Sequence, residues 1–96
     1  MVYLQASIKL YPGKQQDFIE LLNSLTPVLA KYGWKLVGSF ATFAGRLNTA
    51  VDLWELPNPN ALQAALSDPE MQKAASRINE IGEDEVLTLL TKLPVG

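Results

Sequence analysis

The sequence contains no cysteine and no histidine, and these two absences remove most of the common catalytic centres. Without cysteine there is no disulfide framework, thiolate nucleophile, iron–sulfur cluster or thiolate zinc site. Without histidine there is no Ser-His-Asp triad, no imidazole metal ligand and no histidine-ligated haem. Acid–base chemistry near neutral pH would therefore use Asp, Glu, Lys or Tyr side chains with shifted pKa values. We expect neither a metal nor a cofactor.

The sequence also lacks an excess of positive charge, clustered glycines and long apolar runs. Eight basic and ten acidic residues give a net charge of −2, so no basic excess attracts nucleic acid or anionic lipid. The six glycines are scattered singly, unlike the loops that bind phosphates. No apolar run approaches the ~20 residues that span a bilayer, and the first residues alternate like a strand. We expect a soluble, cytoplasmic protein with no nucleic-acid or membrane partner.

What the sequence does contain is one domain of 96 residues, 48% hydrophobic, which is enough for a single core. Alternating apolar residues predict a strand over residues 3–11. After the turn at Pro12-Gly13, apolar residues at helical spacing predict a helix over residues 18–32. Pro27 falls inside this helix, where we expect a kink or a restart capped by Thr26. Gly33 is expected to end the helix in a left-handed conformation.

The second half of the chain continues the pattern. Two strand-like runs over residues 34–44 and 47–56 are joined by Gly45-Arg46, which predicts an antiparallel hairpin. Asn60 is the predicted N-cap of a short helix, and Ser67 with Glu70 has the spacing of a capping box for a second one ending at Gly82. A last strand is predicted over residues 85–93. The order β-α-β-β-α-β predicts an α+β, ferredoxin-like fold, with helices on one face of a four-stranded antiparallel sheet.

The strands are too apolar for a sheet with one solvated face. Trp54, an aromatic residue of the preceding strand (Phe40 or Phe43) and Leu87 or Val86 cannot all point at the helices. The second face is therefore expected to carry large hydrophobic side chains that need a cover, and the simplest cover is another copy of the chain. We predict a homodimer with the two sheets facing each other.

Several short motifs resemble those of the NIPSNAP family. They are, in order, Tyr11-Pro12-Gly13-Lys14 followed by Phe18, Pro27-x-Leu29, Lys35-Leu36-Val37-Gly38, Leu47-Asn48, Leu53-Trp54-Glu55-Leu56 and Asp68-Pro69-Glu70. The resemblance implies a dimeric α+β barrel with a cleft between sheet and helices or toward the barrel lumen. That superfamily includes cofactor-free monooxygenases, isomerases, cyclases and haem proteins. Family relatives often carry a histidine where this chain has Asp52, so histidine-dependent oxygenases and haem enzymes are poor comparisons.

Asp52 is the leading candidate catalytic residue, because a carboxylate in the middle of an apolar strand is costly to bury. A raised pKa would suit it to act as a general base or to hold a polar group of a substrate. The alternative is a structural carboxylate paired across the sheet, or one solvated at the barrel mouth. Tyr3 and Lys9 are further catalytic candidates, since the first and third strands are expected to be neighbours and could bring them to Asp52. With Gln5 and Ser7 they could equally form a polar dimer interface.

The remaining candidates are substrate-binding residues. Gln5 and Ser7 share the polar face of the first strand, and Arg46 could hold a carboxylate or phosphate or simply be solvated in its turn. Phe40 and Trp54, like Trp34 and Phe43, could stack on an aromatic ligand or belong to the core and interface. The acidic residues around Gly82 fit a solvated helix end, with a cation site as the lesser alternative; they are Glu80, Glu83, Asp84 and Glu85.

These features favour a small-molecule-binding protein with a hydrophobic or aromatic ligand. Its chemistry, if it is an enzyme, is expected to be cofactor-free proton transfer of the isomerase, cyclase or decarboxylase type. A non-catalytic homodimeric interaction module is the alternative. A cofactor-free monooxygenase ranks third, because the chain lacks the histidine that is the usual proton acceptor.

Overall fold

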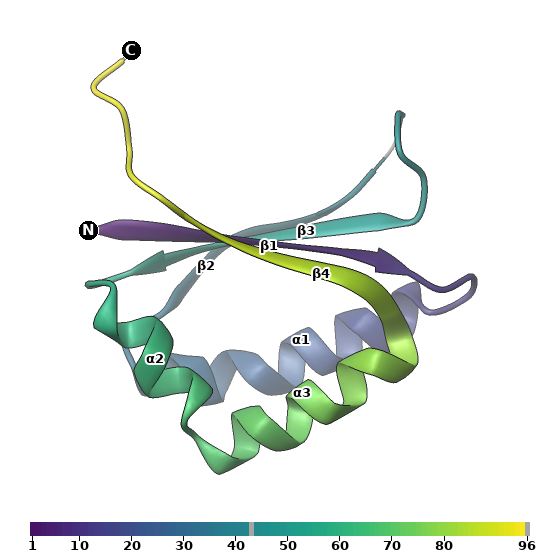
Figure 1. Cartoon of the computed structure of the whole chain (residues 1–96), viewed down its shortest axis with the longest axis horizontal. Helices are drawn as coiled ribbons and strands as arrows, with labels where there is room; N and C mark the ends of the chain where they lie inside the picture. Colours follow the sequence, from purple (N-terminus) through teal and green to yellow (C-terminus); the bar gives the residue numbers. More distant parts are fainter. Residues whose placement is uncertain (43, 96) are drawn as a thin grey trace.

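The computed structural model describes residues 1–42 and 44–95. The elements follow in the order β1 (Val2–Leu10), α1 (Gln15–Ala30), β2 (Lys35–Ala41), β3 (Thr49–Leu56), α2 (Asn60–Leu66), α3 (Pro69–Ile81) and β4 (Gly82–Leu90). The strands form one antiparallel sheet in the order β2-β3-β1-β4. All three helices cover the same face of this sheet (Figure 1). The predicted α+β, ferredoxin-like architecture is confirmed.

The core lies between the sheet and the helices, and strict alternation along the two central strands builds it. On β3 every second residue is buried, from Ala50 to Leu56, and on β1 Leu4, Ile8 and Leu10 are buried. Side chains of α1 close the core from the helix side, among them Phe18, Leu21 and Leu29. Since neighbours on paired strands share a face, these positions define the helix-facing side of the whole sheet.

Helix α1 runs through Pro27 without a restart, so the predicted interruption is wrong. Pro27 lies in the last turn of the helix, where its missing N–H removes a single hydrogen bond and the helix is about to end. The Thr26 hydroxyl donates back to the Leu22 carbonyl oxygen (2.9 Å) and does not cap a new helix. Beyond the helix, Gly33 has the expected left-handed conformation, with φ of +83°.

The caps of the two later helices also differ from the prediction. Asp68, not Ser67, caps α3: its carboxyl accepts from the backbone N–H groups of Glu70 (2.8 Å) and Met71 (3.4 Å). Asn58, not Asn60, supplies the side-chain oxygen at the start of α2, accepting from the Ala61 N–H (3.1 Å). In both cases several capping residue types stand next to one another in the sequence, and the local backbone path decides which one bonds.

The Asp68 carboxyl also joins α3 to the end of α1. It accepts the Tyr32 hydroxyl (2.5 Å) and lies 3.5 Å from Lys31 Nζ. The Tyr32 hydrogen bond is the main reason that the pKa of Asp68 is lowered, and the same bond raises the pKa of Tyr32. Because a lowered folded-state pKa favours the carboxylate, this junction stabilises the fold at neutral pH and weakens as pH falls through that pKa.

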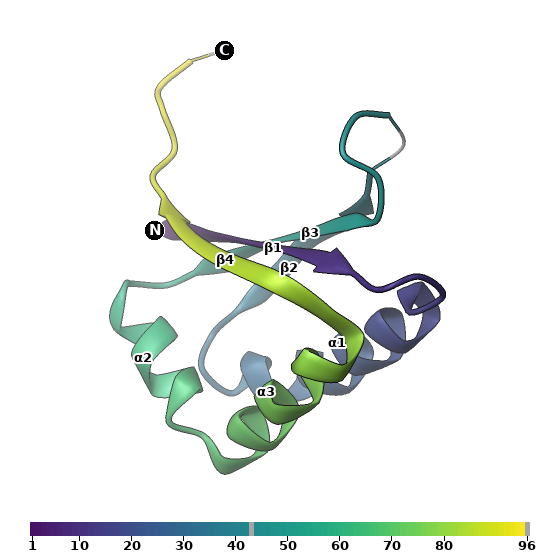
Figure 2. The same ribbon diagram turned by 45° about the vertical axis from the view of Figure 1, so that its right-hand side comes forward.

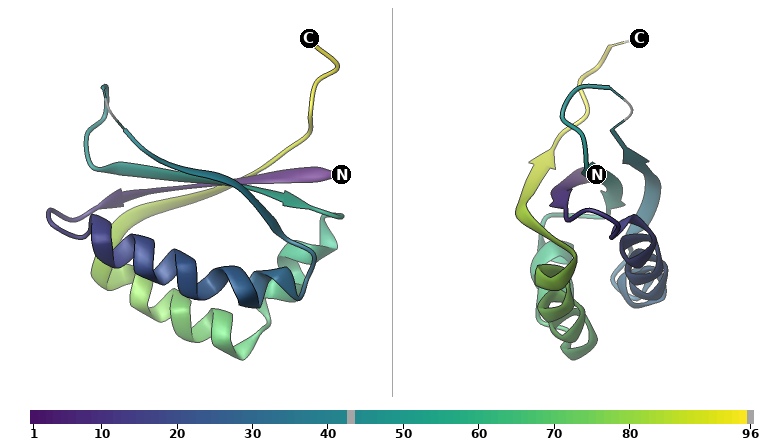
Figure 3. Two further views of the ribbon diagram at one scale, coloured as in Figure 1. Left: turned by 180° about the vertical axis from the view of Figure 1, so that it is seen from behind. Right: turned by 90° about the vertical axis from the view of Figure 1, so that its right-hand side faces the viewer.

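Strand β4 begins at Gly82, directly after α3 and three residues earlier than predicted. A Cβ at Gly82 would lie 2.5 Å from the Lys9 backbone oxygen and 2.9 Å from the Ile8 side chain. Glycine therefore lets the chain pass from helix to strand against β1 with no intervening loop, because any side chain there meets backbone. The strand ends at Leu90, and the tail to residue 95 leaves the body of the domain (Figure 3).

The open face of the sheet is partly apolar, as predicted. Phe40 pairs with Val51 across β2 and β3, and Phe40 is 60% exposed there. Val86 and Leu90 of β4 pair with Ser7 and Tyr3 of β1 on the same face. Trp54 and Leu87 point the other way, toward the helices. Figure 2 shows this face with no element over it apart from the β2–β3 loop and the C-terminal tail, which rise from its edges.

Candidate functional site

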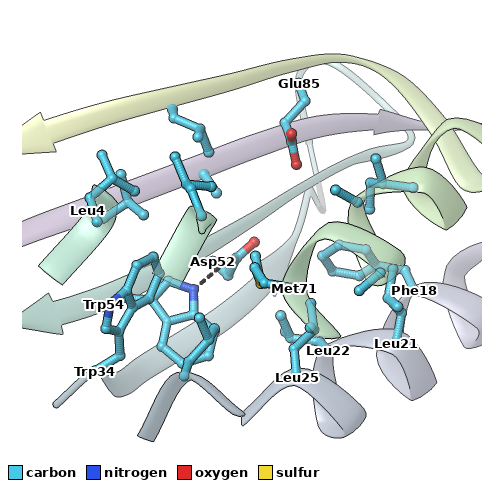
Figure 4. A pocket seen from close by; sticks show the side chains of 18 residues that line it. Leu4, Phe18, Leu21, Leu22, Leu25, Trp34, Asp52, Trp54, Met71 and Glu85 are labelled. Carbon is cyan, nitrogen blue, oxygen red and sulfur yellow. Dashed lines mark hydrogen bonds between the residues drawn. The ribbon is translucent and has the colours of Figure 1, made fainter. Parts of the chain in front are cut away.

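A largely apolar cavity of about 120 Å³ lies between the sheet and the helices. Every helix and the strands β1, β3 and β4 contribute to its wall (Figure 4). The lining side chains are Leu4, Ala6, Phe18, Leu21, Leu22, Leu25, Leu29, Trp34, Asp52, Trp54, Leu62, Leu66, Met71, Ala74, Ala75, Ile78, Glu85 and Leu87. Such a wall suits a small apolar or aromatic molecule.

Asp52 stands in the middle of this wall. It pairs with Ala6 of β1 and Ser39 of β2, and it is only 6% exposed. Because its two strand neighbours across the sheet are small, the cavity remains open in front of its carboxyl group. Burial raises the pKa of Asp52 above the ordinary value for an aspartic acid, and the hydrogen bond from Trp54 partly opposes that rise.

Trp54 is the residue that holds the Asp52 carboxyl. Its indole Nε1–H donates to Asp52 Oδ2 from two positions along the same strand, as the dashed line in Figure 4 shows. Trp34 packs edge-on against Trp54, with ring centroids 5.6 Å apart and planes at 68°. The Trp34 Nε1–H in turn donates to the Ala61 carbonyl oxygen (3.0 Å). The two indoles therefore form a fixed aromatic end to the cavity.

Glu85 is a second carboxyl group in the cavity wall, and sequence reasoning missed it. The sequence predicts that it is solvated, like the other acids around Gly82, and its side chain is exposed, but Glu85 also lines the cavity, as Leu87 does two positions later. In Figure 4 the Glu85 carboxyl points into the cavity from above Asp52. Partial desolvation at the cavity wall raises the pKa of Glu85, and the negative charge of Asp52 adds to the rise. The sequence signal for this face is the alternation along β4, since Leu87 and Leu89 lie two and four residues after Glu85.

The polar residues of β1 lie on the other face of the sheet, away from Asp52. The strand pairing places Ala6 opposite Asp52, so both side chains are on the helix-facing side of the sheet. Because side chains alternate along a strand, the odd-numbered residues of β1 point to the open face. The expected meeting of Tyr3 and Lys9 with Asp52 is therefore wrong. Gln5 and Ser7 share that face with them, and Lys9 lies 4.0 Å from Glu83 at the exposed edge. A role of these four residues at the open face stays a prediction.

The remaining candidate residues from the sequence also lie in different places, some in the cavity and some outside it. Trp54 lies in the cavity, whereas Phe40 lies on the open face and Arg46 is exposed in the loop between β2 and β3. The structure does not bring Phe40 or Arg46 together with Asp52. Phe43, the alternative to Phe40, lies outside the described residues.

The described residues contain no metal-ligand cluster. Within residues 1–42 and 44–95, no group of three or more His, Cys, Asp or Glu side chains is arranged to hold a metal ion. Over the same ranges, no helix is long and apolar enough to cross a membrane. Asp52, which is buried in the cavity wall that Glu85 also lines, is the centre of the candidate site.

Comparison with known proteins places the chain in a family of similar domains. The family model NIPSNAP matches residues 3–94, while no curated protein matches. An uncharacterised NIPSNAP domain protein from Burkholderia xenovorans has 20% identity and a TM-score of 0.79, with 98% of this chain and 96% of that chain covered.

Two further solved structures have the same fold. A NIPSNAP family protein from Agrobacterium tumefaciens has 18% identity and a TM-score of 0.77, covering 97% of this chain and 93% of that one. A structure described as an antibiotic biosynthesis monooxygenase has 16% identity and a TM-score of 0.74, covering 98% and 100%. At these identities the likeness concerns the fold.

Proposed function

From the premise that the chain belongs to the NIPSNAP family, whose fold it has, we propose that it binds a small hydrophobic or aromatic molecule in the cavity between sheet and helices. Asp52 is the polar group that recognises this molecule. The observation that carries the proposal is a carboxyl group buried in an otherwise apolar, aromatic-ended cavity.

The location of Asp52 is hard to explain by stability alone. Burying a carboxylate costs free energy unless cations or hydrogen-bond donors compensate, and among the described residues the only side-chain donor to it is the Trp54 indole. An apolar residue in its place would pack against Leu4 and Trp54 without that cost. Buried, perturbed carboxyl groups in cavities are characteristic of binding and catalytic sites.

The catalytic form of this proposal is proton transfer with Asp52 as base. Its raised pKa brings it closer to the range in which a carboxylate both accepts and returns a proton. Isomerisation and cyclisation can proceed by proton transfer through such a group when the cavity limits access of water. Cofactor-free oxygenation is the second candidate reaction, favoured only by the similarity in fold to the antibiotic biosynthesis monooxygenase.

Filling the cavity is expected to abolish ligand binding. Ala6→Leu adds three carbon atoms at the point where β1 faces Asp52, which occupies much of a 120 Å³ space. Trp34 and Trp54 are the only tryptophans of the chain and both line the cavity, so a bound molecule changes the intrinsic fluorescence. We expect a saturable change with benzyl alcohol for the wild type and none for Ala6→Leu.

Ala64→Leu is the matched control, because Ala64 is exposed on α2 and does not line the cavity. It makes the same change in composition and should bind benzyl alcohol like the wild type. Equal binding by Ala6→Leu and Ala64→Leu would show that the ligand sits elsewhere.

The proposal also includes a homodimer that covers the open sheet face. This face presents Phe40, Val51 and Leu53 beside Val86 and Leu90, a mixture that is unusual for a face left in water. We expect a species of about 21 kDa in native mass spectrometry, twice the chain mass of 10.5 kDa. Val51→Lys should give the monomer, since it puts a charge at the centre of the face.

Ala64→Lys is the control for the dimer, since it adds the same charge on the exposed side of α2. It should leave the 21 kDa species in place. A wild-type protein that is monomeric at micromolar concentration would contradict the sheet-to-sheet dimer and leave the cavity proposal standing.

A further inference from the structure

We propose that the cavity selects an apolar molecule carrying one protonated amino group, and that this group lies between the carboxyl groups of Asp52 and Glu85. The inference rests on the proposed function, because it names the class of ligand for the same cavity. It adds Glu85 as a binding residue.

The two carboxyl groups reach the cavity from different strands. Asp52 comes from β3 and Glu85 from β4, with β1 between them. Ala6 of β1 pairs with Asp52 on one side and on the other with Leu87, two residues from Glu85. Because its side chain is only a methyl group, Ala6 leaves room in front of Asp52. In Figure 4 both carboxyl groups project into that space.

Asp52 offers a carboxyl oxygen as an acceptor there. In the part of the chain that the structure describes, the side chain that donates to it is that of Trp54, to Oδ2, and the backbone N–H of Asp52 itself also contributes a hydrogen bond to the carboxyl group. Asp52 is 94% buried, and its carboxyl group faces the cavity (Figure 4). A ligand N–H placed in the cavity would donate to it, and a charged N–H forms the stronger hydrogen bond with a carboxylate.

The charge of the cavity wall selects among donors. Asp52 and Glu85 are the titratable groups among the lining residues that the structure describes, and α1 and α3 contribute only apolar side chains. The basic residues Lys73 and Arg77 of α3 lie in the outer groove between α1 and α3, beside Glu70. Lys9 is on the open face. An anionic ligand would therefore be repelled, whereas an ammonium group would be attracted by both acids.

Three molecules with one aromatic ring test the inference: benzylamine (cationic), benzyl alcohol (neutral) and benzoate (anionic). Binding is followed by tryptophan fluorescence at about pH 7.5, about three units above the ordinary carboxyl pKa, to favour the ionised forms of Asp52 and Glu85, whose pKa values are raised. We expect benzylamine to bind about tenfold tighter than benzyl alcohol, the difference between a charge-assisted and a neutral hydrogen bond. Benzoate should not bind.

Single substitutions test whether Glu85 binds the amino group together with Asp52. Glu85→Gln should bring the affinity for benzylamine down toward that for benzyl alcohol, while leaving the affinity for benzyl alcohol within about twofold. Glu83→Gln is the matched control, because Glu83 lies on the same strand but faces Lys9 at the exposed edge. It should behave like the wild type with all three molecules.

The pH dependence of the affinity for benzylamine is an independent test of the inference. Lowering the pH protonates Asp52 and Glu85 and removes the charge that attracts the ammonium group, whereas benzylamine itself stays protonated. The affinity for benzylamine should therefore fall on acidification, and that for benzyl alcohol should stay level.

The outcomes separate the two proposals. If benzyl alcohol binds as tightly as benzylamine, or if Glu85→Gln binds benzylamine like the wild type, the inference is wrong and the cavity remains a site for neutral apolar molecules. If none of the three molecules changes the fluorescence, both proposals fail.

Discussion

Replacing Trp54 by alanine is expected to lower the free energy of unfolding by about 3–5 kcal/mol, the range for truncating a buried large aromatic residue. Trp54 is 2% exposed, packs edge-on against Trp34 and donates to Asp52. The total free energy of unfolding of a small domain is about 5–15 kcal/mol, so the variant should be near the limit of folding. Urea unfolding followed by circular dichroism measures the loss.

Trp54→Phe separates the packing from the hydrogen bond. The smaller ring keeps much of the core contact but leaves the buried Asp52 carboxyl without its donor, which costs about 1–3 kcal/mol. It should also raise the pKa of Asp52 further, because the Trp54 bond lowers it. Trp34→Phe is the comparison, since Trp34 donates to a backbone carbonyl oxygen. A loss below about 1 kcal/mol for Trp54→Ala would contradict the described core.

Asp52→Asn is expected to abolish the preference for benzylamine and any proton-transfer activity, and at the same time to stabilise the fold at neutral pH by about 1 kcal/mol. Asparagine retains an oxygen that accepts from Trp54 and has the same size, so the core should be unchanged. What disappears is the cost of keeping a charge in an apolar cavity. Thermal and urea unfolding at neutral pH, together with the fluorescence titration, measure both effects.

The pH dependence of this difference has a definite sign. Burial raises the pKa of folded Asp52 above that of the unfolded chain. The stability that the protonated group contributes is therefore fully present below the unfolded pKa and is lost as pH rises through the folded one. The advantage of Asp52→Asn should accordingly shrink on acidification to about pH 4, near the unfolded pKa. An Asp52→Asn protein less stable than the wild type at neutral pH would mean that the carboxylate is structural.

The fold was predictable because the two periodicities of the chain are clear. Alternation over β1 and helical spacing over α1 each identify an element, and the order of elements leaves one common architecture. The first and last residues of the helices and strands were harder to predict. The start of β4 depends on how closely Gly82 approaches the Lys9 carbonyl oxygen, which is a tertiary contact that the local sequence does not contain.

The candidate site was only half predictable. Asp52 stood out as a charge among apolar residues, but β3 has hydrophobic residues on both sides, Leu53 as well as Trp54, so the pattern could not say which face Asp52 joins. The pairing of Ala6 with Asp52 decides that face and separates Asp52 from Tyr3 and Lys9. Glu85 was not a site candidate because the acidic segment predicts solvent exposure, and Glu85 is exposed while it lines the cavity.

The most direct test of the central claim is an NMR titration of the two tryptophan indole N–H signals with benzylamine. Trp54 donates to Asp52 and Trp34 to the Ala61 carbonyl oxygen, so the indole signals report on the cavity from inside. We predict that both signals shift saturably, the Trp54 signal more than the Trp34 signal, and that neither shifts in Ala6→Leu. Signals that stay in place while benzylamine is in large excess would contradict the assignment of this cavity as the binding site.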